Sequence, residues 1–233
     1  FVDLLDARRM EEILRRNLES INAELSGVYQ QPALDVEPIV SDYLGYAEQL
    51  RPYIADVSEI LIDALDAGRH VIAEGAQGAL LDIDYGTYPY VTSSSTVAAN
   101  ALVGLGIGLR REARVIGVAK VFQTRVGEGP FPTELRDEVA AYLRGDGSKQ
   151  WDEFGTTTGR PRRIGWLDGV MLRHVARTNH VDELALTKLD VLSGLEEIKV
   201  CVGYEGVQAG QEFLALESAQ PVYRSFSGWT GDL

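Results

Sequence analysis

Cysteine is nearly absent from the chain, because Cys201 is the single one among 233 residues. One thiol excludes an internal disulfide framework and a four-cysteine zinc site. No apolar run approaches the roughly 20 residues that a membrane-spanning helix needs, and no Asn-x-Ser/Thr glycosylation acceptor occurs. We therefore expect a cytoplasmic protein without a membrane partner.

Positive charge is also scarce. The chain has 22 Lys and Arg against 35 Asp and Glu, a net charge of -13. Such a balance argues against a protein that binds a nucleic acid duplex through a broad basic face, so we expect no nucleic-acid partner. A nucleotide site needs only a few local cations, so the negative net charge does not exclude one. With 45% hydrophobic and 24% charged residues, the composition is typical of a globular protein and too apolar for a disordered one.

Several common catalytic motifs are missing. The sequence contains no Gly-x-x-x-x-Gly-Lys-Ser/Thr phosphate loop, no His-Glu-x-x-His and no Gly-x-Ser-x-Gly. Its histidines, His70, His174 and His180, do not cluster in the sequence, which makes a metal site built on them improbable. Candidate binding residues must therefore be sought in loops outside these motifs.

The first part of the chain, residues 1–68, is predicted to be helical. Apolar residues recur at helical spacing in two stretches, 10–25 and 39–50. A third helix is predicted to begin at Asp56, with Glu59 placed as in a capping box, and to end at Gly68. The apolar residues of these helices are expected to pack in a core.

From residue 69 onwards the pattern changes to strands alternating with helices, which is typical of an α/β fold with a mixed, mostly parallel sheet covered by helices. We treat residues 69–233 as one α/β portion of a single larger domain that binds nucleotide and substrate. Because the chain begins at Phe1 within helix-forming sequence and stops shortly after Trp229, we expect it to be a piece of a longer protein. The predicted strands are 70–74, 113–122, 184–187 and 198–202, and the predicted helices are 98–103, 134–143 and 166–177.

The loop after the first predicted strand has the composition of a ligand site. Glycines flank Gln77, which lets the backbone approach a ligand, and an amide can pair with the edge of a purine. Thr92 and the following serines precede a predicted helix, where hydroxyl and N–H groups can bind an anion. The alternative is that Thr92 or Ser93 is an ordinary helix cap. Asp82 and Asp84 are more easily explained as structural residues than as a metal pair.

A second loop, residues 156–163, concentrates positive charge in an acidic chain. Three of its last four residues are arginines, and three threonines and a glycine precede them. Arginine grips carboxylates and phosphates through two parallel hydrogen bonds, so a dicarboxylate or a phosphate is the expected ligand. The alternative is a solvated basic turn, which leaves the threonines and the glycine without a role.

A third loop, Thr187-Lys188-Leu189-Asp190, follows a predicted strand. An aspartate there can accept hydrogen bonds from N1–H and the 2-amino group of guanine, and the lysine stem can lie along the base plane. The element resembles the Asn-Lys-x-Asp motif of GTP-binding proteins.

Taken together and in order, these loops resemble the adenylosuccinate synthetase family. The resemblance covers nearly the whole chain and is strongest between Glu74 and Leu192. It rests on Glu74-Gly-Ala-Gln-Gly78 with Leu81-Asp-Ile-Asp84, Gly86-Thr-Tyr-Pro-Tyr-Val-Thr-Ser-Ser94, Thr124-Arg-Val-Gly127 with Gly129-Pro-Phe-Pro-Thr-Glu134, Phe154-Gly-Thr-Thr-Thr-Gly-Arg-Pro-Arg-Arg163, Gly165-Trp-Leu-Asp168 and Thr187-Lys-Leu-Asp190.

The resemblance implies a P-loop-type GTP-utilising synthetase fold, present here incompletely. It also implies a carbon–nitrogen ligase of AMP biosynthesis that joins IMP and L-aspartate with GTP and Mg²⁺ through a 6-phosphoryl-IMP intermediate, and that forms a homodimer. At matching positions it assigns IMP to Gln77, Thr92, Val126, Gly127 and Arg160; aspartate to Thr156, Thr157, Thr158, Gly159, Arg160, Pro161 and Arg162; and GTP to Arg162, Lys188, Leu189 and Asp190.

Other parts of the family pattern have no match in this chain. These are the amino-terminal phosphate loop with its aspartate base and Mg²⁺ ligands, the catalytic histidine, the arginine lent across the dimer, and the carboxy-terminal part of the guanine site. We therefore expect no catalytic residue and no metal ligand in this chain, and no turnover by this chain alone, because no matched position supplies a base for N1 of IMP.

Two other interpretations stay open. The first is a non-catalytic module that binds GTP or IMP for regulation, although such a protein would be expected to have lost Gln77, Arg160 or Arg162, which are all present. The second is a dimerising fragment that folds by packing on a partner copy.

Overall fold

The computed structural model describes residues 2–109, 113–155 and 159–231. The chain forms two compact units, Phe1–Asp63 and Ala64–Leu233. No helix within the described ranges is both long enough and apolar enough to cross a membrane. The division into a helical region, residues 1–68, and an α/β portion of a single larger domain, residues 69–233, stays a prediction.

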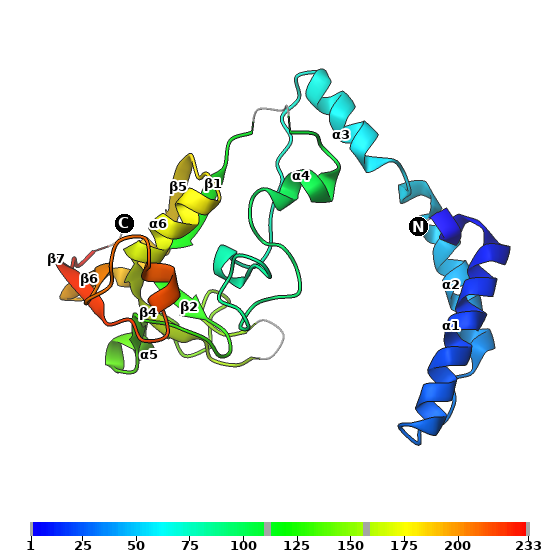
Figure 1. Ribbon diagram of the computed structural model, residues 1–233, viewed down its shortest axis with the longest axis horizontal. Coiled ribbons are helices and arrows are strands. Elements are labelled where there is room, and N and C mark those ends of the chain that lie inside the picture. Colours follow the sequence, from blue (N-terminus) through cyan, green and yellow to red (C-terminus); the bar gives the residue numbers. More distant parts are fainter. Residues whose placement is uncertain (1, 110–112, 156–158, 232–233) are drawn as a thin grey trace. The chain divides into compact units, whose positions relative to one another are not determined.

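The first unit is helical, as the apolar spacing predicts. Helix α1 (Ala7–Gly27) runs beside helix α2 (Val36–Leu50), as Figure 1 shows. Each begins at an aspartate whose carboxylate accepts a backbone N–H of the first turn: Asp6 caps α1 and Asp35 caps α2. Met10, Leu18, Val40 and Ala47 are the buried residues of these helices. Short 3₁₀ helices, Val2–Leu5 and Arg51–Tyr53, complete this part.

Helix α3 (Val57–Asp66) follows the sequence prediction at both ends. The Asp56 carboxylate accepts the Glu59 N–H at 3.1 Å, which satisfies one of the unpaired donors of the first turn. At the other end Gly68 adopts a positive φ of 73°, and its N–H donates to the Leu65 carbonyl. The helix therefore ends where a residue without a Cβ permits the left-handed conformation.

The strand predicted at residues 70–74 is wrong. This segment has no regular secondary structure, and Ile72 is 92% exposed. A strand exists only where a neighbouring backbone pairs with it, and the described strands provide no partner for these residues. Apolar composition alone was not sufficient.

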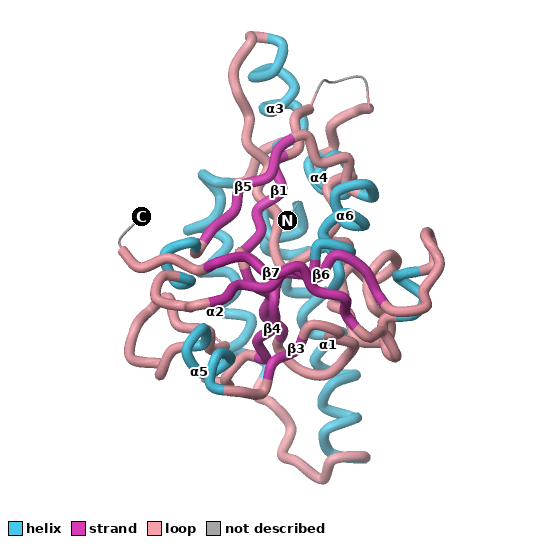
Figure 2. The backbone as a smooth tube through the Cα atoms, turned by 90° about the vertical axis from the view of Figure 1, so that its left-hand side faces the viewer, coloured by secondary structure: helices cyan, strands magenta, loops and turns pink. Residues whose placement is uncertain are grey.

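The second unit contains two sheets, which Figure 2 shows as magenta segments. Strands β1 (Ile116–Lys120) and β5 (Glu183–Thr187) form a parallel pair. The larger sheet has the order β2-β4-β6-β7, with β3 also paired to β4. Its strands are β2 (Phe122–Arg125), β3 (Glu134–Leu135), β4 (Arg163–Asp168), β6 (Glu197–Tyr204) and β7 (Pro221–Ser227). The predicted strands at 184–187 and 198–202 are confirmed, and the one at 113–122 becomes β1 followed by β2.

The pairing confirms a mixed α/β fold. Strands β4 and β6 are parallel, as are β1 and β5, whereas the other pairs between described strands are antiparallel. Antiparallel pairing is thus more prominent than the sequence suggested, because β2 and β3 both run opposite to β4.

The helices of this unit begin later than predicted. Helix α4 is Asn100–Leu105, α5 is Glu138–Arg144 and α6 is Gly169–Thr178. Asp137 and Asp168 cap α5 and α6 through their carboxylates, so the residues before each cap are free to be strands. Glu134 and Trp166, predicted as helical, accordingly lie in β3 and β4.

Two apolar clusters form the core of the second unit. Helix α5 packs against β4, and α6 packs against β6. The first cluster contains Val121, Phe122, Ala140, Leu143, Ile164, Trp166, Leu192 and Ile198. The second contains Val170, Met171, Cys201, Tyr204, Leu216 and Ala219. These clusters support the strand ends from which the candidate site is built.

Candidate functional site

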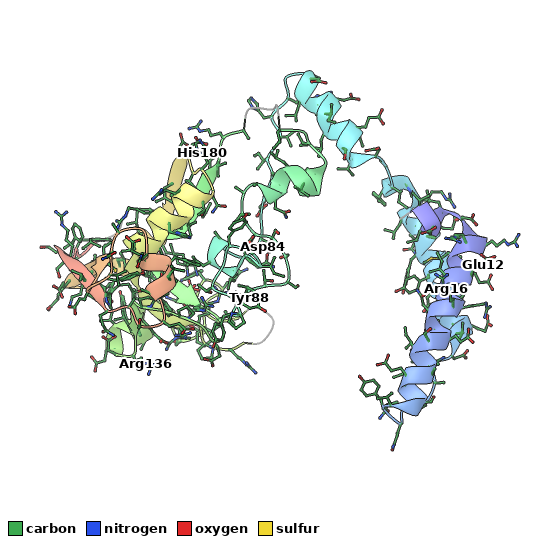
Figure 3. All side chains as sticks on the ribbon, viewed as in Figure 1. Glu12, Arg16, Asp84, Tyr88, Arg136 and His180 are labelled. Carbon is green, nitrogen blue, oxygen red and sulfur yellow. The ribbon has the colours of Figure 1, made fainter. Side chains whose placement is uncertain are left out.

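One buried carboxylate organises the loop after Gln77. Asp82 is fully buried and accepts four backbone N–H groups, those of Asp84, Tyr85, Thr96 and Val97. Burial alone would raise the pKa of Asp82, but these hydrogen bonds outweigh it and hold the pKa below its ordinary value. Asp82 is therefore a structural residue, as the sequence indicated. Asp84, which Figure 3 labels, lies in the loop that Asp82 holds in place.

Thr92 does not lie at a helix start. Helix α4 begins at Asn100, with Ala99 at its N-cap and no side-chain cap. Neither the predicted helix-start anion site nor the alternative helix cap at Thr92 or Ser93 is therefore present in this form. Instead the Thr92 N–H donates to the Leu81 carbonyl at 2.8 Å, so Thr92 is held beside the Asp82 turn.

Three of the residues predicted for IMP come together in one cavity. Gln77, Thr92 and Val126 line a space of about 350 Å³. They come from two segments that lie far apart in the sequence. Gln77 has a φ of 61°, a left-handed conformation that is uncommon for residues other than glycine and that clusters at functional sites. The other lining residues are Leu81, Tyr90, Val91, Arg125 and Glu128.

Arg125 joins the two sides of this cavity. It belongs to the Thr124-Arg-Val-Gly127 motif, but the sequence indicated no role for it. Its Nη2 donates to the Thr87 hydroxyl at 3.1 Å and to the Tyr90 carbonyl at 3.0 Å, and its Nε donates to the Glu128 carbonyl at 2.8 Å. A planar guanidinium with several donors can hold two backbone segments at once. Arg125 therefore positions the cavity walls.

Arg163 has a similar structural role next to Gly127. Glu134 accepts from it through both oxygens, at 2.7 and 2.8 Å, and its Nη1 donates to the carbonyls of Gly127 and Gly129. The hydrogen bonds from Arg163 lower the pKa of Glu134. Arg163 is thus engaged within the protein, and it shapes the turn that contains Val126 and Gly127.

The two described arms of the arginine loop, residues 153–155 and 159–162, pair in antiparallel orientation, and we call these paired arms the arginine hairpin. The Gly155 N–H donates to the Arg160 carbonyl at 2.8 Å, and the Arg162 N–H donates to the Glu153 carbonyl at 2.9 Å. Gly159, Arg160 and Pro161 are exposed on its returning arm. Thr156, Thr157 and Thr158, predicted for aspartate, lie outside the described residues.

A second buried carboxylate lies at the base of this hairpin. Glu153 has a side chain that is 1% exposed, and three cations surround it: Lys120, Arg162 and Lys188. Lys120 Nζ and Arg162 Nη1 each lie 2.7 Å from the carboxylate. Burial alone would raise the pKa of Glu153, but the hydrogen bonds from the two lysines lower it below its ordinary value. Arg162 and Lys188, both predicted for GTP, therefore meet at one residue that sequence analysis missed.

Lys188 occupies a constrained position directly after β5. Its φ is 64°, and its Nζ donates both to Glu153 and to the Trp151 carbonyl. Leu189 and Asp190 continue into a 3₁₀ helix, Leu189–Leu192, and both are exposed. The strand-then-loop context predicted for this element is confirmed, and the ammonium group is held inside the protein.

Two groupings of predicted residues thus result, one at the 350 Å³ cavity and one at Glu153. Arg160 does not line the cavity among the described residues, and Asp190 is exposed beyond Lys188. Nothing in the sequence marks Glu153 or Lys120 as part of a site. Each is simply a charged residue next to an aromatic or apolar neighbour. No cluster of three or more His, Cys, Asp or Glu side chains able to hold a metal ion occurs among the residues that the structure describes.

The chain is similar in sequence to one family of known proteins. Residues 1–233 match the family model described as adenylosuccinate synthetase. An adenylosuccinate synthetase of Synechococcus sp. (strain JA-2-3B'a(2-13)) is 51% identical over 235 residues, covering 98% of this chain and 51% of the relative. One of Desulfosudis oleivorans is 50% identical over 238 residues, covering 100% of this chain and 54% of the relative.

A solved structure agrees with these sequences. Fully ligated adenylosuccinate synthetase from Plasmodium falciparum superposes with a TM-score of 0.84 at 41% identity, and the match covers 98% of this chain and 54% of that chain. The chain spans about half the length of the curated relatives it matches. Because the family model matches along the whole sequence, the chain belongs to the adenylosuccinate synthetase family.

Proposed function

We propose that the protein containing this chain joins IMP and L-aspartate to form adenylosuccinate, with GTP as the phosphoryl donor. The observation that carries the proposal is the common cavity of Gln77, Thr92 and Val126, the residues that the family resemblance assigns to IMP. In this reaction GTP phosphorylates the 6-oxygen of IMP, and the aspartate amine then displaces the phosphate.

In the IMP site, Gln77 pairs with the purine edge through its amide, which offers a donor and an acceptor together. Thr92 lies near the 5′-phosphate, and Val126 and Gly127 line the ribose. Arg160 reaches IMP from the exposed arm of the hairpin. The Arg125 and Arg163 hydrogen bonds hold the walls in place, so that little ordering is required when the nucleotide binds.

The arginine loop is the proposed aspartate site. Thr156 to Thr158, Gly159, Arg160, Pro161 and Arg162 would surround the two carboxylates of the substrate. Arginine suits this ligand because its fork matches a carboxylate in geometry and charge. An ordered loop over the substrate would also exclude water from the phosphorylated intermediate.

The guanine site is proposed at Lys188, Leu189 and Asp190, with Arg162 on the same side. Asp190 is exposed after β5, at the strand end where α/β sheets bind ligands, and it would accept N1–H and the 2-amino group of the base. With its ammonium group held by Glu153, Lys188 presents its aliphatic stem to the ring. Such groups act by positioning and electrostatics, which dominate phosphoryl transfer.

Three further features complete the proposal. Mg²⁺ accompanies GTP in the reaction, but the described residues offer no ligand set for it, and no step here depends on it. The protein acts as a homodimer in the cytoplasm. These features rest on the family resemblance.

The test is an assay of the full-length protein for adenylosuccinate formed from IMP, aspartate, GTP and Mg²⁺. Gln77→Ala, Arg160→Ala and Asp190→Ala remove one proposed contact from each pocket. Glu197→Gln is a matched control, because Glu197 pairs with Lys199 on β6 and is exposed.

Product formed by the unmodified protein and by Glu197→Gln supports the function. The pockets are supported if KM rises for IMP in Gln77→Ala, for aspartate and IMP in Arg160→Ala, and for GTP in Asp190→Ala. If the unmodified protein binds GTP or IMP without forming product, the ligase proposal fails and a regulatory module is favoured.

A further inference from the structure

Glu153 connects three segments that are remote in the sequence. Lys120 ends β1, Arg162 lies on the arginine hairpin and Lys188 follows β5. All three bring a cationic nitrogen to the same carboxylate. A buried carboxylate requires a partner of opposite charge, but a single cation would neutralise it. Three cations around one carboxylate leave an excess of positive charge that folding alone does not require.

We propose that Glu153 is a positioning residue that holds Arg162 and Lys188 in one arrangement, so that the aspartate loop and the guanine loop bind their ligands as a unit. This inference rests on the proposed function and adds to it a residue that touches neither ligand. The residue would make the two pockets dependent on each other, since both take a side chain from the same ion cluster.

The contacts of Lys188 support a fixed orientation. An ammonium group has three N–H donors. One is directed to Glu153, one to the Trp151 carbonyl at 2.6 Å, and Nζ lies 5.8 Å from the centre of the Phe122 ring. The head of the side chain is therefore engaged within the protein. What Lys188 can offer a guanine is its stem, and the direction of the stem depends on where Glu153 holds the head.

Arg162 is held from several sides as well. Its N–H donates to the Glu153 carbonyl, its carbonyl accepts from Arg144 Nε at 2.8 Å, and its Nη1 donates to the Glu153 carboxylate. Its Nε is buried and has no hydrogen-bond partner among the described residues. Buried donors are normally satisfied, so a donor left over beside a fixed guanidinium is consistent with a place for a ligand oxygen.

Removing the charge of Glu153 should release both side chains together. In Glu153→Gln the three cations lose their common partner, repel one another and move apart. We expect KM for GTP and KM for aspartate each to rise about tenfold, the size typical of losing a hydrogen bond to a charged group. KM for IMP should rise by clearly less than the other two, because the cavity of Gln77, Thr92 and Val126 does not include this cluster and only Arg160 connects IMP with the loop.

The measurement uses the full-length protein and determines kcat and the three KM values, together with GDP affinity by titration calorimetry. Tyr204→Phe is the matched structural control, because Tyr204 donates to another buried carboxylate, Asp168, and should lower stability without a selective change in KM. Glu153→Asp keeps the charge on a shorter side chain and should show the same selective pattern at smaller size. It also serves as the test if Glu153→Gln does not fold.

Unchanged KM values, tighter GDP binding, or a uniform rise of all three KM values in parallel with Tyr204→Phe would overturn the positioning role. Failure of the proposed function is separate: the unmodified protein would then form no adenylosuccinate. GDP affinity still tests the inference in that case, since Glu153→Gln should weaken it about tenfold and an unchanged affinity would contradict it.

Discussion

Two of the buried carboxylates in the second unit are satisfied in opposite ways. Asp82 accepts four backbone N–H groups from its own loop segment. Glu153 accepts cationic side chains from three separate segments. Both are almost inaccessible to solvent, and both have a lowered pKa.

The difference indicates two functions for a buried negative charge. A carboxylate that binds backbone groups determines the path of the chain, so its loss should affect folding of the loop first. A carboxylate that binds side chains determines where those side chains point, so its loss should affect ligand binding first. Each of the following predictions tests one side of this contrast.

The largest effect is expected for Asp82→Asn. The amide places an N–H group against backbone donors and leaves buried groups unpaired, which should lower the free energy of unfolding by about 3 kcal/mol. Urea unfolding of the full-length protein measures it. If Asp82→Asn instead keeps full stability and alters only KM values, the two carboxylates do not differ and the contrast fails.

The pH dependence of the same variant gives a second test. Because the folded-state pKa of Asp82 lies below its ordinary value of 3.8, its contribution to stability is complete above that value and is lost as the pH falls through the folded pKa. The stability gap between the unmodified protein and Asp82→Asn should therefore close at acid pH. A gap that stays constant from pH 7 to pH 3 would show that the charge of Asp82 is not involved.

Tyr204→Phe tests a third buried carboxylate, Asp168, which binds both backbone groups and a side chain. Asp168 is fully buried and accepts two backbone N–H groups at the start of α6 and the Tyr204 hydroxyl. Removing the hydroxyl leaves one oxygen without that partner, at a cost of about 2 kcal/mol. The unfolding midpoint in urea should fall while the KM values stay unchanged.

Arg125→Lys tests whether a side-chain cation can also hold backbone. Lysine cannot reproduce the fork that joins Thr87, Tyr90 and Glu128. We expect KM for IMP to rise about tenfold, which is about 1.4 kcal/mol, with KM for GTP unchanged. Steady-state kinetics with each substrate varied in turn separates the two. A parallel rise in both values would assign Arg125 to general stability.

The smallest effect is expected for Arg15→Gln in the first unit. Arg15 joins Glu11 on α1 to Glu37 on α2, and all of these side chains are well exposed. Exposed ion pairs contribute little because water screens them. The urea midpoint should stay within experimental error. A clear loss would show that exposed pairs matter here as much as the buried carboxylates.

Much of the local structure could be predicted from the sequence. Caps, glycine and apolar spacing act within a few residues. They account for the helix start at Asp56, its end at Gly68 and the strand that ends at Thr187. The segment 70–74 failed because a strand depends on a partner that its own composition cannot supply. Trp166 was assigned to a helix because a short apolar run does not distinguish a buried strand from a helix.

The candidate site divides in the same way. Gln77, Thr92 and Val126 could be chosen from motifs, and the structure brings them to one cavity. Glu153 and Lys120 could not, since nothing in their immediate neighbours distinguishes them from other charged residues, and Arg125 lies in a motif, Thr124-Arg-Val-Gly127, in which the sequence assigned no role to the arginine.

The sequence by itself determined the family, most local elements and the types of side chain available for binding. This is because motifs, caps and apolar periodicity depend only on residues that are close together in the sequence. The tertiary structure alone decided which charges meet. Lys120 and Lys188 lie 33 and 35 residues from Glu153, and they reach it because β1 and β5 pair in parallel and end together. Burial then makes those contacts strong, since a carboxylate removed from water depends on the partners that folding brings to it.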